Sequence, residues 1–149
     1  MDYQIFLEPP VNFVPKMIVV GCMVECDGRM LFLKRSSQSH QGGTFSIPGG
    51  KLEPGETPLQ AVSRELFEET HIQLEKSALT YAGVFFQKIP FIDFVFHLFR
   101  VELESFPKIT LSHEHSDYMW VTYDEALLLP LIAGGREALY YHYLWKESH

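Results

Sequence analysis

The sequence predicts an α/β or α+β fold in which helices cover the faces of a mixed β-sheet. Segments rich in β-branched and aromatic residues recur along the chain, and these residue types favour strands. Between them lies one strongly marked amphipathic helix, with further helical segments towards the C-terminus. The 149 residues are 46% hydrophobic, with charges of both signs dispersed, so we expect a single domain over residues 1–149 with one substantial core.

The first segment, Met1–Lys16, contains three prolines, and we expect an irregular or edge lead-in that could also reach a second subunit. A β pattern then runs from Met17 to Cys26. Cys22 and Cys26 share one face of that pattern with its valines. We therefore expect buried free thiols there, in preference to a disulfide or a zinc pair.

The remaining strands follow from turn signals and composition. Asp27-Gly28 is typical of a hairpin turn and leads into a strand over Met30–Arg35. The phenylalanines of the later strands are expected mainly in the core, by alternation along each strand. The further strands are predicted around Phe45–Ile47, Leu79–Gln87, Ile92–Leu103 and Tyr118–Val121.

The clearest helix is predicted over Pro58–Thr70. Thr57 can cap it, proline suits its first turn, and Gln60 completes a Thr-x-x-Gln capping box. Its leucines and valine form an apolar stripe that would pack on the sheet. Two shorter helices are predicted over Asp124–Leu129 and about Gly135–Trp145, and the aromatic residues of the last one could pack on the sheet or on a second subunit.

Glu65, Glu68 and Glu69 fall on one stripe of the predicted helix, because positions i, i+3 and i+4 are surface neighbours. Like charges repel there, and a divalent cation would reverse that cost. The preceding turn, Pro48–Gly50, allows main-chain carbonyls to approach a ligand closely. Hard cations such as Mg²⁺ take oxygen ligands of this mixed kind and also bind substrate phosphates. On its own, the acidic cluster also fits a solvated helix face.

The residues around this cluster resemble the Nudix box, G-x5-E-x7-R-E-U-x-E-E-x-G-U, in which U is a bulky aliphatic residue. The one departure is His71, where the family has glycine, and histidine enters the positive-φ region more readily than most residues. The eight matching positions are Gly50, Glu56, Arg64, Glu65, Leu66, Glu68, Glu69 and Ile72.

The resemblance extends beyond the box on both sides. Gly43–Gly50 is similar to the family's G-x-W-x-x-P-G-G approach, with Phe45 in the place of the tryptophan. Trp120-Val121 followed by Asp124–Ala126 is similar to the strand and short helix that close the family's domain. The resemblance therefore implies the Nudix α/β/α sandwich, with a mixed sheet between the helices.

The resemblance also implies a reaction. Family members of this type hydrolyse a nucleoside diphosphate linked to a group X and release a nucleoside monophosphate. The metal, Mg²⁺ with Mn²⁺ as a substitute, would be held by the Gly49 carbonyl with Glu65, Glu68 and Glu69. Arg64 would orient these carboxylates with Glu56 as its counterpart, and Gly50 would be structural. A nucleoside triphosphate, normal or oxidised, is slightly favoured over a nucleotide sugar. The alternative is a nucleotide-binding sensor without turnover.

The catalytic base stays open between Glu65 and Glu114. Glu114 lies in a polar stretch, Ser112–Asp117, where many family members carry a late glutamate near the metals. A loop glutamate without a special role is the other interpretation. His113 and His115 in the same stretch could bind zinc, but the spacing alone is weak, and a surface pair is favoured.

Substrate contacts are predicted from charge and aromatic character. Arg35 ends a strand that, by the resemblance, leads to the phosphate-binding cleft, and Lys51 is a second nearby cation. Phe45 and Tyr118 are the aromatic residues that could stack on a base. His40-Gln41 could border the cleft entrance, although a plain turn is favoured.

Charge and hydropathy exclude other classes of partner. The formal charge of −7 argues against a nucleic-acid polymer, because such binding draws on a basic surface. No apolar run approaches the roughly 18 residues of a membrane span, and no signal peptide is recognisable. We therefore expect a cytoplasmic protein that acts on a small nucleotide, with a homodimer left open.

Overall fold

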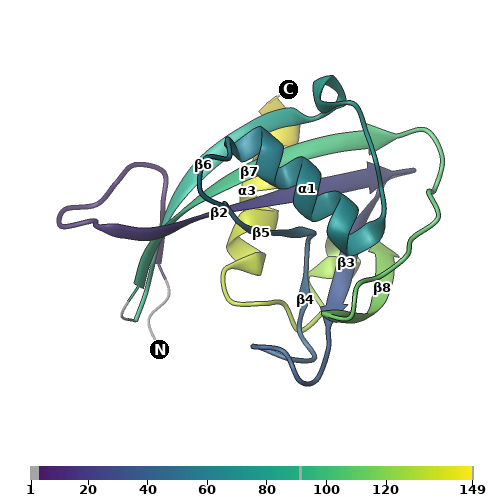
Figure 1. The fold of residues 1–149 in the computed structure, drawn as a ribbon, viewed down its shortest axis with the longest axis horizontal. Helices are drawn as coiled ribbons and strands as arrows, with labels where there is room; N and C mark the ends of the chain where they lie inside the picture. Colours follow the sequence, from purple (N-terminus) through teal and green to yellow (C-terminus); the bar gives the residue numbers. More distant parts are fainter. Residues whose placement is uncertain (1–3, 91, 149) are drawn as a thin grey trace.

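A computed structural model describes residues 4–90 and 92–148 of the chain. A mixed eight-stranded sheet forms its middle layer (Figure 1). The order along the sheet is β1-β6-β7-β2-β3-β4, with β5 on β2 and β8 on β3. The strands are β1 (Gln4–Phe6), β2 (Pro15–Cys26), β3 (Arg29–Arg35), β4 (Phe45–Ser46), β5 (Gly49–Lys51), β6 (Thr80–Ile89), β7 (Ile92–Leu103) and β8 (His115–Val121).

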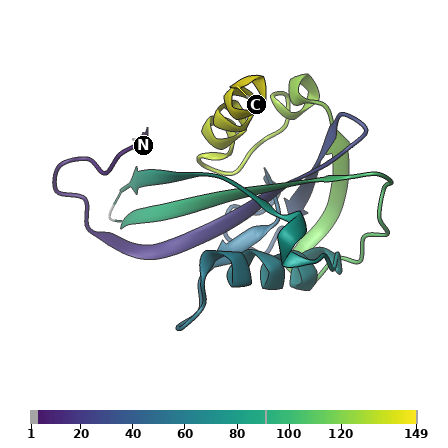
Figure 2. The same cartoon turned by 90° about the horizontal axis from the view of Figure 1, so that it is seen from above.

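Helices cover both faces of the sheet, as Figure 2 shows from above. The helix α1 (Pro58–Thr70) and the short 3-10 turn η1 (Lys76–Ala78) lie on one side. The helices α2 (Tyr123–Ala126) and α3 (Gly135–Ser148) lie on the other side. A separate cluster of buried apolar residues fills each of the two interfaces. The expected α/β/α sandwich with a mixed sheet is confirmed.

Helix α1 has the bounds that its sequence predicts, because both of its ends are specified locally. The Thr57 hydroxyl accepts a hydrogen bond from the Gln60 N–H, and the Gln60 side chain accepts one from the Thr57 N–H. The helix ends at His71, which adopts the left-handed conformation with φ 62° and donates its N–H to the Phe67 carbonyl. The face that carries Leu66 is buried against the sheet.

The two long central strands, β2 and β7, pair in parallel over nearly their whole length. At the end of β2 the predicted hairpin is present, with Asp27 and Gly28 both at positive φ, as a two-residue hairpin turn requires. Cys22 and Cys26 are buried free thiols, as expected. Burial raises the pKa of Cys22 to about 12, so this thiol stays protonated and unreactive.

The sheet splits between β2 and β3, and this split positions the site. The two strands pair only next to their hairpin, at Glu25 with Met30 and Cys26 with Arg29. Further along, β2 pairs with β5, whereas β3 pairs with β4 and β8. The segment that contains β4 and β5 therefore fills the space where the strands diverge.

The strand predictions differ from the structure in a few places. Strand β5 was not predicted, because its two glycines lack the side chains that mark a strand. The lead-in contains the edge strand β1, while residues 1–3 of that segment lie outside the described residues. Strand β8 begins at His115, three residues before its predicted start, because Ser116 and Asp117 resemble loop residues.

The later helices also differ in their bounds. Helix α2 ends at Ala126 rather than Leu129, and Leu128 and Leu129 instead donate to carbonyls three residues back. Pro130 follows, and the residue before a proline disfavours helical geometry. Helix α3 begins at the predicted glycine and continues to Ser148. None of the helices in the described part of the chain is long and apolar enough to cross a membrane.

Helix α3 is attached to the sheet by a buried charge cluster around Glu25, which is 4% exposed. Its carboxylate accepts hydrogen bonds from Arg100, His142 and Lys146 at 3.1, 3.0 and 2.6 Å. Burial alone would raise the pKa of Glu25, but the hydrogen bonds from His142 and Lys146 outweigh it and hold the pKa at about 2. The predicted packing of the C-terminal helix on the sheet is thus confirmed, with an ionic contact the sequence did not indicate.

Among the predicted core phenylalanines, Phe85, Phe94 and Phe99 are buried. Phe86 and Phe96 are partly buried. Phe91 lies outside the described residues.

Candidate active site

Gly49 lies on β5, and its N–H and carbonyl groups are directed away from β2. The Cys22 N–H donates to the Pro48 carbonyl and the Leu52 N–H donates to the Ile18 carbonyl, both at 2.9 Å. Because such pairs alternate along an antiparallel ladder, Gly49 occupies a non-hydrogen-bonded position opposite Gly21. Its N–H donates instead to Glu69 Oε1 at 2.8 Å, which connects β5 to the end of α1.

Both glycines of β5 are required by close contacts. A Cβ atom on Gly50 would lie 2.5 Å from the Glu65 carboxylate, and one on Gly49 would collide with the Val20 carbonyl. Real Cβ atoms essentially never approach another heavy atom this closely. The Glu65 carboxylate therefore lies directly against the β5 backbone.

Arg64 donates hydrogen bonds to carboxylates on both sides of it in the sequence. Its Nε and Nη2 donate to the two oxygens of Glu56 at 2.7 and 2.9 Å, a bidentate pair. Its Nη1 donates to Glu65 at 2.9 Å and to Glu68 at 3.2 Å, and Nη2 reaches the Lys51 carbonyl at 3.1 Å. The hydrogen bonds from Arg64 hold the pKa of Glu56 at about 2. Arg64 thus contacts every carboxylate that it was expected to orient, apart from Glu69.

Glu69 carries an unusually placed charge, because its side chain is only 5% exposed. Its pKa is raised to about 8, mainly by burial; the Gly49 N–H and the Arg35 charge lower this pKa, and the negative charges of Glu65 and Glu114 raise it. Burial also raises the pKa of Glu65. The negative charge of Glu114 therefore disfavours the ionisation of both Glu65 and Glu69.

The donor set fits a hard divalent cation. Among the described residues, no three Asp, Glu, His or Cys side chains already surround one point as ligands would. Glu65 and Glu68 are instead hydrogen-bonded to Arg64, and Glu68 is more than half exposed. The raised pKa of Glu69 shows that the protein's own groups leave its charge poorly compensated. A cation with oxygen ligands would supply that compensation.

A main-chain hydrogen bond fixes the position of Glu114. The Ser36 N–H donates to the Glu114 carbonyl at 2.9 Å, which ties the segment before β8 to the end of β3. The Glu114 side chain is exposed, and its charge acts on both Glu65 and Glu69. The structure thus places Glu114 within electrostatic range of the carboxylates of α1.

The predicted surface pair of histidines is wrong. His113 is exposed, but His115 is buried, because it lies on β8 opposite Arg35 at an irregularity of the register. Burial lowers the pKa of His115, with the Arg35 charge adding to the effect.

A cavity of about 280 Å³ reaches the same two glycines from the other face of the sheet. Its floor includes Met23 and Phe32, which belong to the apolar cluster beneath α3, and its wall includes Ala138 of α3. The polar side chains of its lining are Arg35, His40, Gln41, Ser46 and Gln87, and no carboxylate is among the described lining residues. Gly49-Gly50 thus separates a carboxylate cluster from an apolar cavity.

The sequence did not identify most of this cavity. Alternation predicts Phe94 and Phe96 in the core, but both line the cavity, and Gln87 lines it while only 3% exposed. Alternation places Gln87 on a buried face of its strand, and a polar residue there was the available signal.

Arg35 is the predicted cation that the structure places at the cavity. It lines the cavity, and its Nε donates to the His40 carbonyl at 2.6 Å, which fixes the guanidinium plane. Lys51 contributes its carbonyl to Arg64, while its side chain is exposed and outside the lining. A contact between Lys51 and the substrate stays a prediction.

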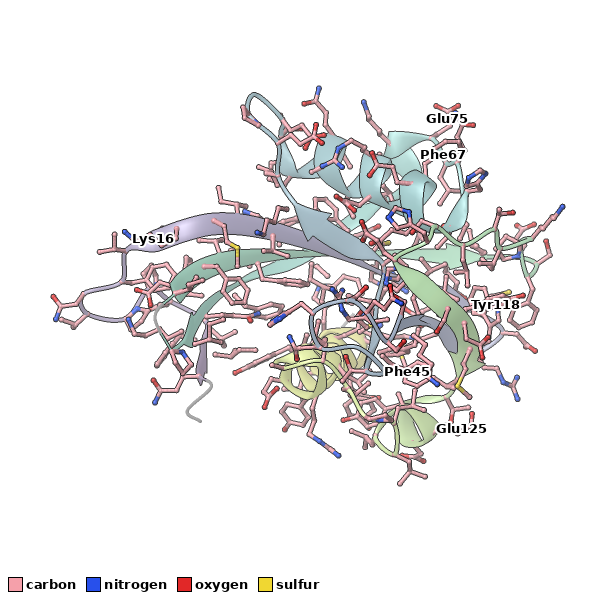
Figure 3. All side chains as sticks on the ribbon, turned by 60° about the horizontal axis from the view of Figure 1, so that its bottom comes forward. Lys16, Phe45, Phe67, Glu75, Tyr118 and Glu125 are labelled. Carbon is pink, nitrogen blue, oxygen red and sulfur yellow. The ribbon has the colours of Figure 1, made fainter. Side chains whose placement is uncertain are left out.

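The two predicted stacking residues are not placed to stack in this cavity. Phe45 is only 8% exposed and packs in the cluster beneath α2 and α3. Tyr118 is exposed on β8, but it pairs with Leu33, so it lies on the face covered by α1. Figure 3 shows Phe45 on the side of Glu125 and α2, opposite Phe67 of α1. Neither residue lines the cavity, and a stacking contact of Phe45 or Tyr118 with a base stays a prediction.

The NUDIX domain family matches residues 15–143 of the chain. The chain belongs to the Nudix family. A CTP pyrophosphohydrolase of Escherichia coli (strain K12) is 35% identical over 117 residues, which cover 78% of this chain and 84% of the relative. A MutT-like protein of Streptomyces ambofaciens is 38% identical over 117 residues, 78% of this chain and 68% of that protein. The crystal structure of the MutT protein from Methanosarcina mazei Go1 superposes with a TM-score of 0.75 at 25% identity, covering 90% of this chain and 95% of that one.

Membership confirms the family and the sandwich that the sequence predicts, together with the assignment as a Nudix pyrophosphohydrolase. The segment that resembles the Nudix box lies within the matched residues. Within it, His71 keeps the left-handed conformation that glycine would adopt, and its ring stacks on Phe67 at a centroid distance of 5.0 Å. The departure from the family pattern is thus accommodated locally.

Proposed function

We propose that this Nudix protein uses Mg²⁺ to hydrolyse the pyrophosphate bond of a nucleoside diphosphate linked to X. A nucleoside triphosphate, normal or oxidised, is the first candidate substrate, and a nucleotide sugar is the second. The observation that supports this proposal is the meeting of two features at Gly49-Gly50. The carboxylates of Glu65 and Glu69 reach these glycines from the α1 face, and an apolar cavity reaches them from the α3 face.

The cavity suits a nucleoside, and the carboxylates suit the charged part of the substrate. Apolar side chains with a few polar groups are typical of small-molecule sites. The triphosphate is favoured because a relative over most of the chain is a CTP pyrophosphohydrolase. At the junction, the guanidinium of Arg35 would donate hydrogen bonds to phosphate oxygens.

Glu65, Glu69 and the Gly49 carbonyl would hold the cation, with Glu68 reaching it on release from Arg64. When bound, Mg²⁺ neutralises phosphate charge and lowers the pKa of a coordinated water. Arg64 keeps Glu65 oriented, and the Gly49 N–H keeps Glu69 oriented. The protein's contribution is therefore a set of carboxylates held in place before the substrate arrives.

In the reaction, a water oxygen attacks one phosphorus and the bridging P–O bond breaks. For a triphosphate attacked at the α-phosphorus, the products are a nucleoside monophosphate and pyrophosphate. We assign Glu114 as the group that accepts the proton of the water. Its carboxylate has no ion-pair partner among the described residues, whereas Glu65 is hydrogen-bonded to Arg64 and is the second candidate.

The experiment is an incubation of the purified protein with Mg²⁺ and a panel of nucleotides, with chromatographic separation of products. The panel contains nucleoside triphosphates, oxidised nucleotides, nucleotide sugars, ADP-ribose and dinucleoside polyphosphates. Release of a nucleoside monophosphate from one substrate, lost in Glu69→Gln, would support the proposal. Binding of a nucleotide without turnover of any would favour a sensor and overturn it.

A further inference from the structure

The loop between β3 and β4 carries one residue with an unusual conformation at the cavity. Gln41 adopts φ 55°, which is uncommon for a residue other than glycine, asparagine or aspartate. The loop holds it there: the Gln41 carbonyl accepts hydrogen bonds from the N–H and the hydroxyl of Thr44. Strained backbone that the surroundings maintain is characteristic of functional positions.

The orientation of the Gln41 amide is fixed by chemistry. Its Oε1 accepts a hydrogen bond from the Ala133 N–H at 2.9 Å, in the segment just before α3. The opposite orientation would set two donors against each other, so the NH₂ group occupies the other position. That NH₂ group has no hydrogen-bond partner among the described residues, and Gln41 lines the cavity. Two N–H donors are therefore available to a ligand.

The rest of the cavity offers donors and neutral amides but no carboxylate among its described lining residues. An exocyclic amino group of a base is well read by a fixed acceptor, and an exocyclic carbonyl oxygen by a fixed donor. We propose that Gln41 is a specificity-determining residue, which donates its amide N–H to an exocyclic carbonyl oxygen of the substrate's base. This inference rests on the proposed function, which it deepens.

A hydrogen-bond donor at Gln41 would discriminate against adenine relative to the other common bases. Guanine, hypoxanthine, cytosine and uracil each carry an exocyclic carbonyl oxygen, and adenine carries none. Hypoxanthine and adenine form a matched pair, because the carbonyl of one replaces the amino group of the other. The protein should therefore prefer inosine nucleotides to adenosine nucleotides of the same charge.

Gln41→Glu is the sharpest test, because the new carboxylate can still accept from the Ala133 N–H while an acceptor replaces the NH₂ donor. We expect the wild type to favour ITP over ATP in kcat/KM, chiefly through KM. The variant should lower this ratio by at least tenfold. Comparing the two nucleotides cancels the general repulsion between the added charge and a triphosphate. Gln38→Glu, on the same loop but outside the lining, is the matched control and should keep the wild-type ratio.

The dissociation constants of IMP and AMP, measured by calorimetry, give the same ratio without turnover. If no substrate is hydrolysed but IMP still binds better than AMP and loses that advantage in Gln41→Glu, the proposed function fails and this inference stands. An equal affinity for IMP and AMP in the wild type would overturn the inference. An equal loss of affinity for IMP and AMP in Gln41→Glu would also overturn the inference, because the role of Gln41 would then be structural or purely electrostatic.

Discussion

The carboxylate of Glu69 accepts a hydrogen bond from the backbone N–H of Gly49 across 2.8 Å, and this bond connects the last turn of α1 to β5. It forms because Gly49 lies at a position of the ladder where its N–H is directed away from β2. The same bond favours the ionised form of the buried Glu69 carboxylate, whereas the negative charges of Glu65 and Glu114 disfavour it. The site therefore retains an electrostatic cost in the metal-free protein.

Glu69→Gln should remove the electrostatic cost of the buried carboxylate, and it should also abolish most of the activity. Glutamine keeps an acceptor for the Gly49 N–H but carries no charge, so the melting temperature of the metal-free protein at pH 8 should rise. A gain on the order of 1 kcal/mol corresponds to roughly 2–4 °C for a protein of this size. Turnover should fall by orders of magnitude, and added Mg²⁺ should stabilise the variant less than the wild type.

Calorimetry with and without Mg²⁺, together with the nucleotide assay, measures these effects. Glu75→Gln removes one negative charge at an exposed position before η1, and it should change none of the three: the melting temperature, the turnover or the stabilisation by Mg²⁺. Near-normal activity in Glu69→Gln would remove Glu69 from the metal site.

Local signals in the sequence predicted α1 and its carboxylates well. The capping box of Thr57 and Gln60 and the spacing of Glu65, Glu68 and Glu69 involve neighbours within a few turns of one helix. Such contacts are largely independent of the rest of the fold. The hairpin at Asp27-Gly28 was predictable for the same reason.

Features that depend on distant parts of the chain were not predictable. Gly49 and Gly50 form a strand only because β2 and β3 diverge and leave an edge to pair with. The burial of His115 depends on its pairing with Arg35 across the sheet. Which face of the sheet each aromatic residue occupies likewise depends on the pairing of its strand, as for Tyr118 opposite Leu33. A single sequence gives the alternation along a strand but not the helix that covers each face.

Gly50→Ala should destabilise the protein and impair catalysis. The added Cβ would lie 2.5 Å from the Glu65 carboxylate, so that side chain must move out of its place beside β5. Overpacking of this kind costs about 1–3 kcal/mol. Urea unfolding measures the change, and Glu65→Asp tests its cause. Aspartate is one methylene shorter, so the double variant should lose less stability than the sum of the two single variants. Strict additivity would exclude the steric explanation.

Glu114→Gln should lower kcat by about 10²–10⁴ with little change in KM, the range expected for loss of a general base. The carbonyl that binds the Ser36 N–H is unchanged, so the segment should keep its place. Steady-state kinetics over a range of pH measures the effect. Asp117→Asn, a similar change on the neighbouring β8, is the control and should retain activity. If Glu114→Gln retains wild-type kcat, the base assignment moves to Glu65.

His71→Gly and His71→Ala should differ in stability. Glycine relieves the positive φ of 62°, worth about 1–2 kcal/mol, but loses the stacking on Phe67, worth about 0.5–1.5 kcal/mol. The two effects nearly cancel, so His71→Gly should be close to neutral or slightly stabilising. Alanine keeps the strain and loses the stacking, so His71→Ala should be destabilised by about 1 kcal/mol. Thermal unfolding measures both variants, and activity should be unchanged. A large loss of activity in His71→Gly would reveal a chemical role for the ring.

The Glu25 cluster should make stability depend on pH in the acid range. The pKa of Glu25 is about 2 in the folded protein and 4.5 without such contacts, so the folded state favours the ionised form. The resulting stabilisation is fully present above pH 4.5 and is lost as the pH falls towards 2. The shift corresponds to roughly 3 kcal/mol at 1.36 kcal/mol per unit.

Glu25→Gln isolates this contribution, because glutamine resembles the protonated glutamic acid in shape and hydrogen bonding. Urea unfolding at pH 6, 4 and 3 should show the wild type more stable than the variant by a margin that narrows as the pH falls. At pH 3 the margin should be clearly smaller than at pH 6, because Glu25 is then protonated in the unfolded chain but still ionised beside Arg100 and Lys146 in the folded protein. A margin that stays constant with pH would mean that Glu25 contributes packing rather than charge to the attachment of α3.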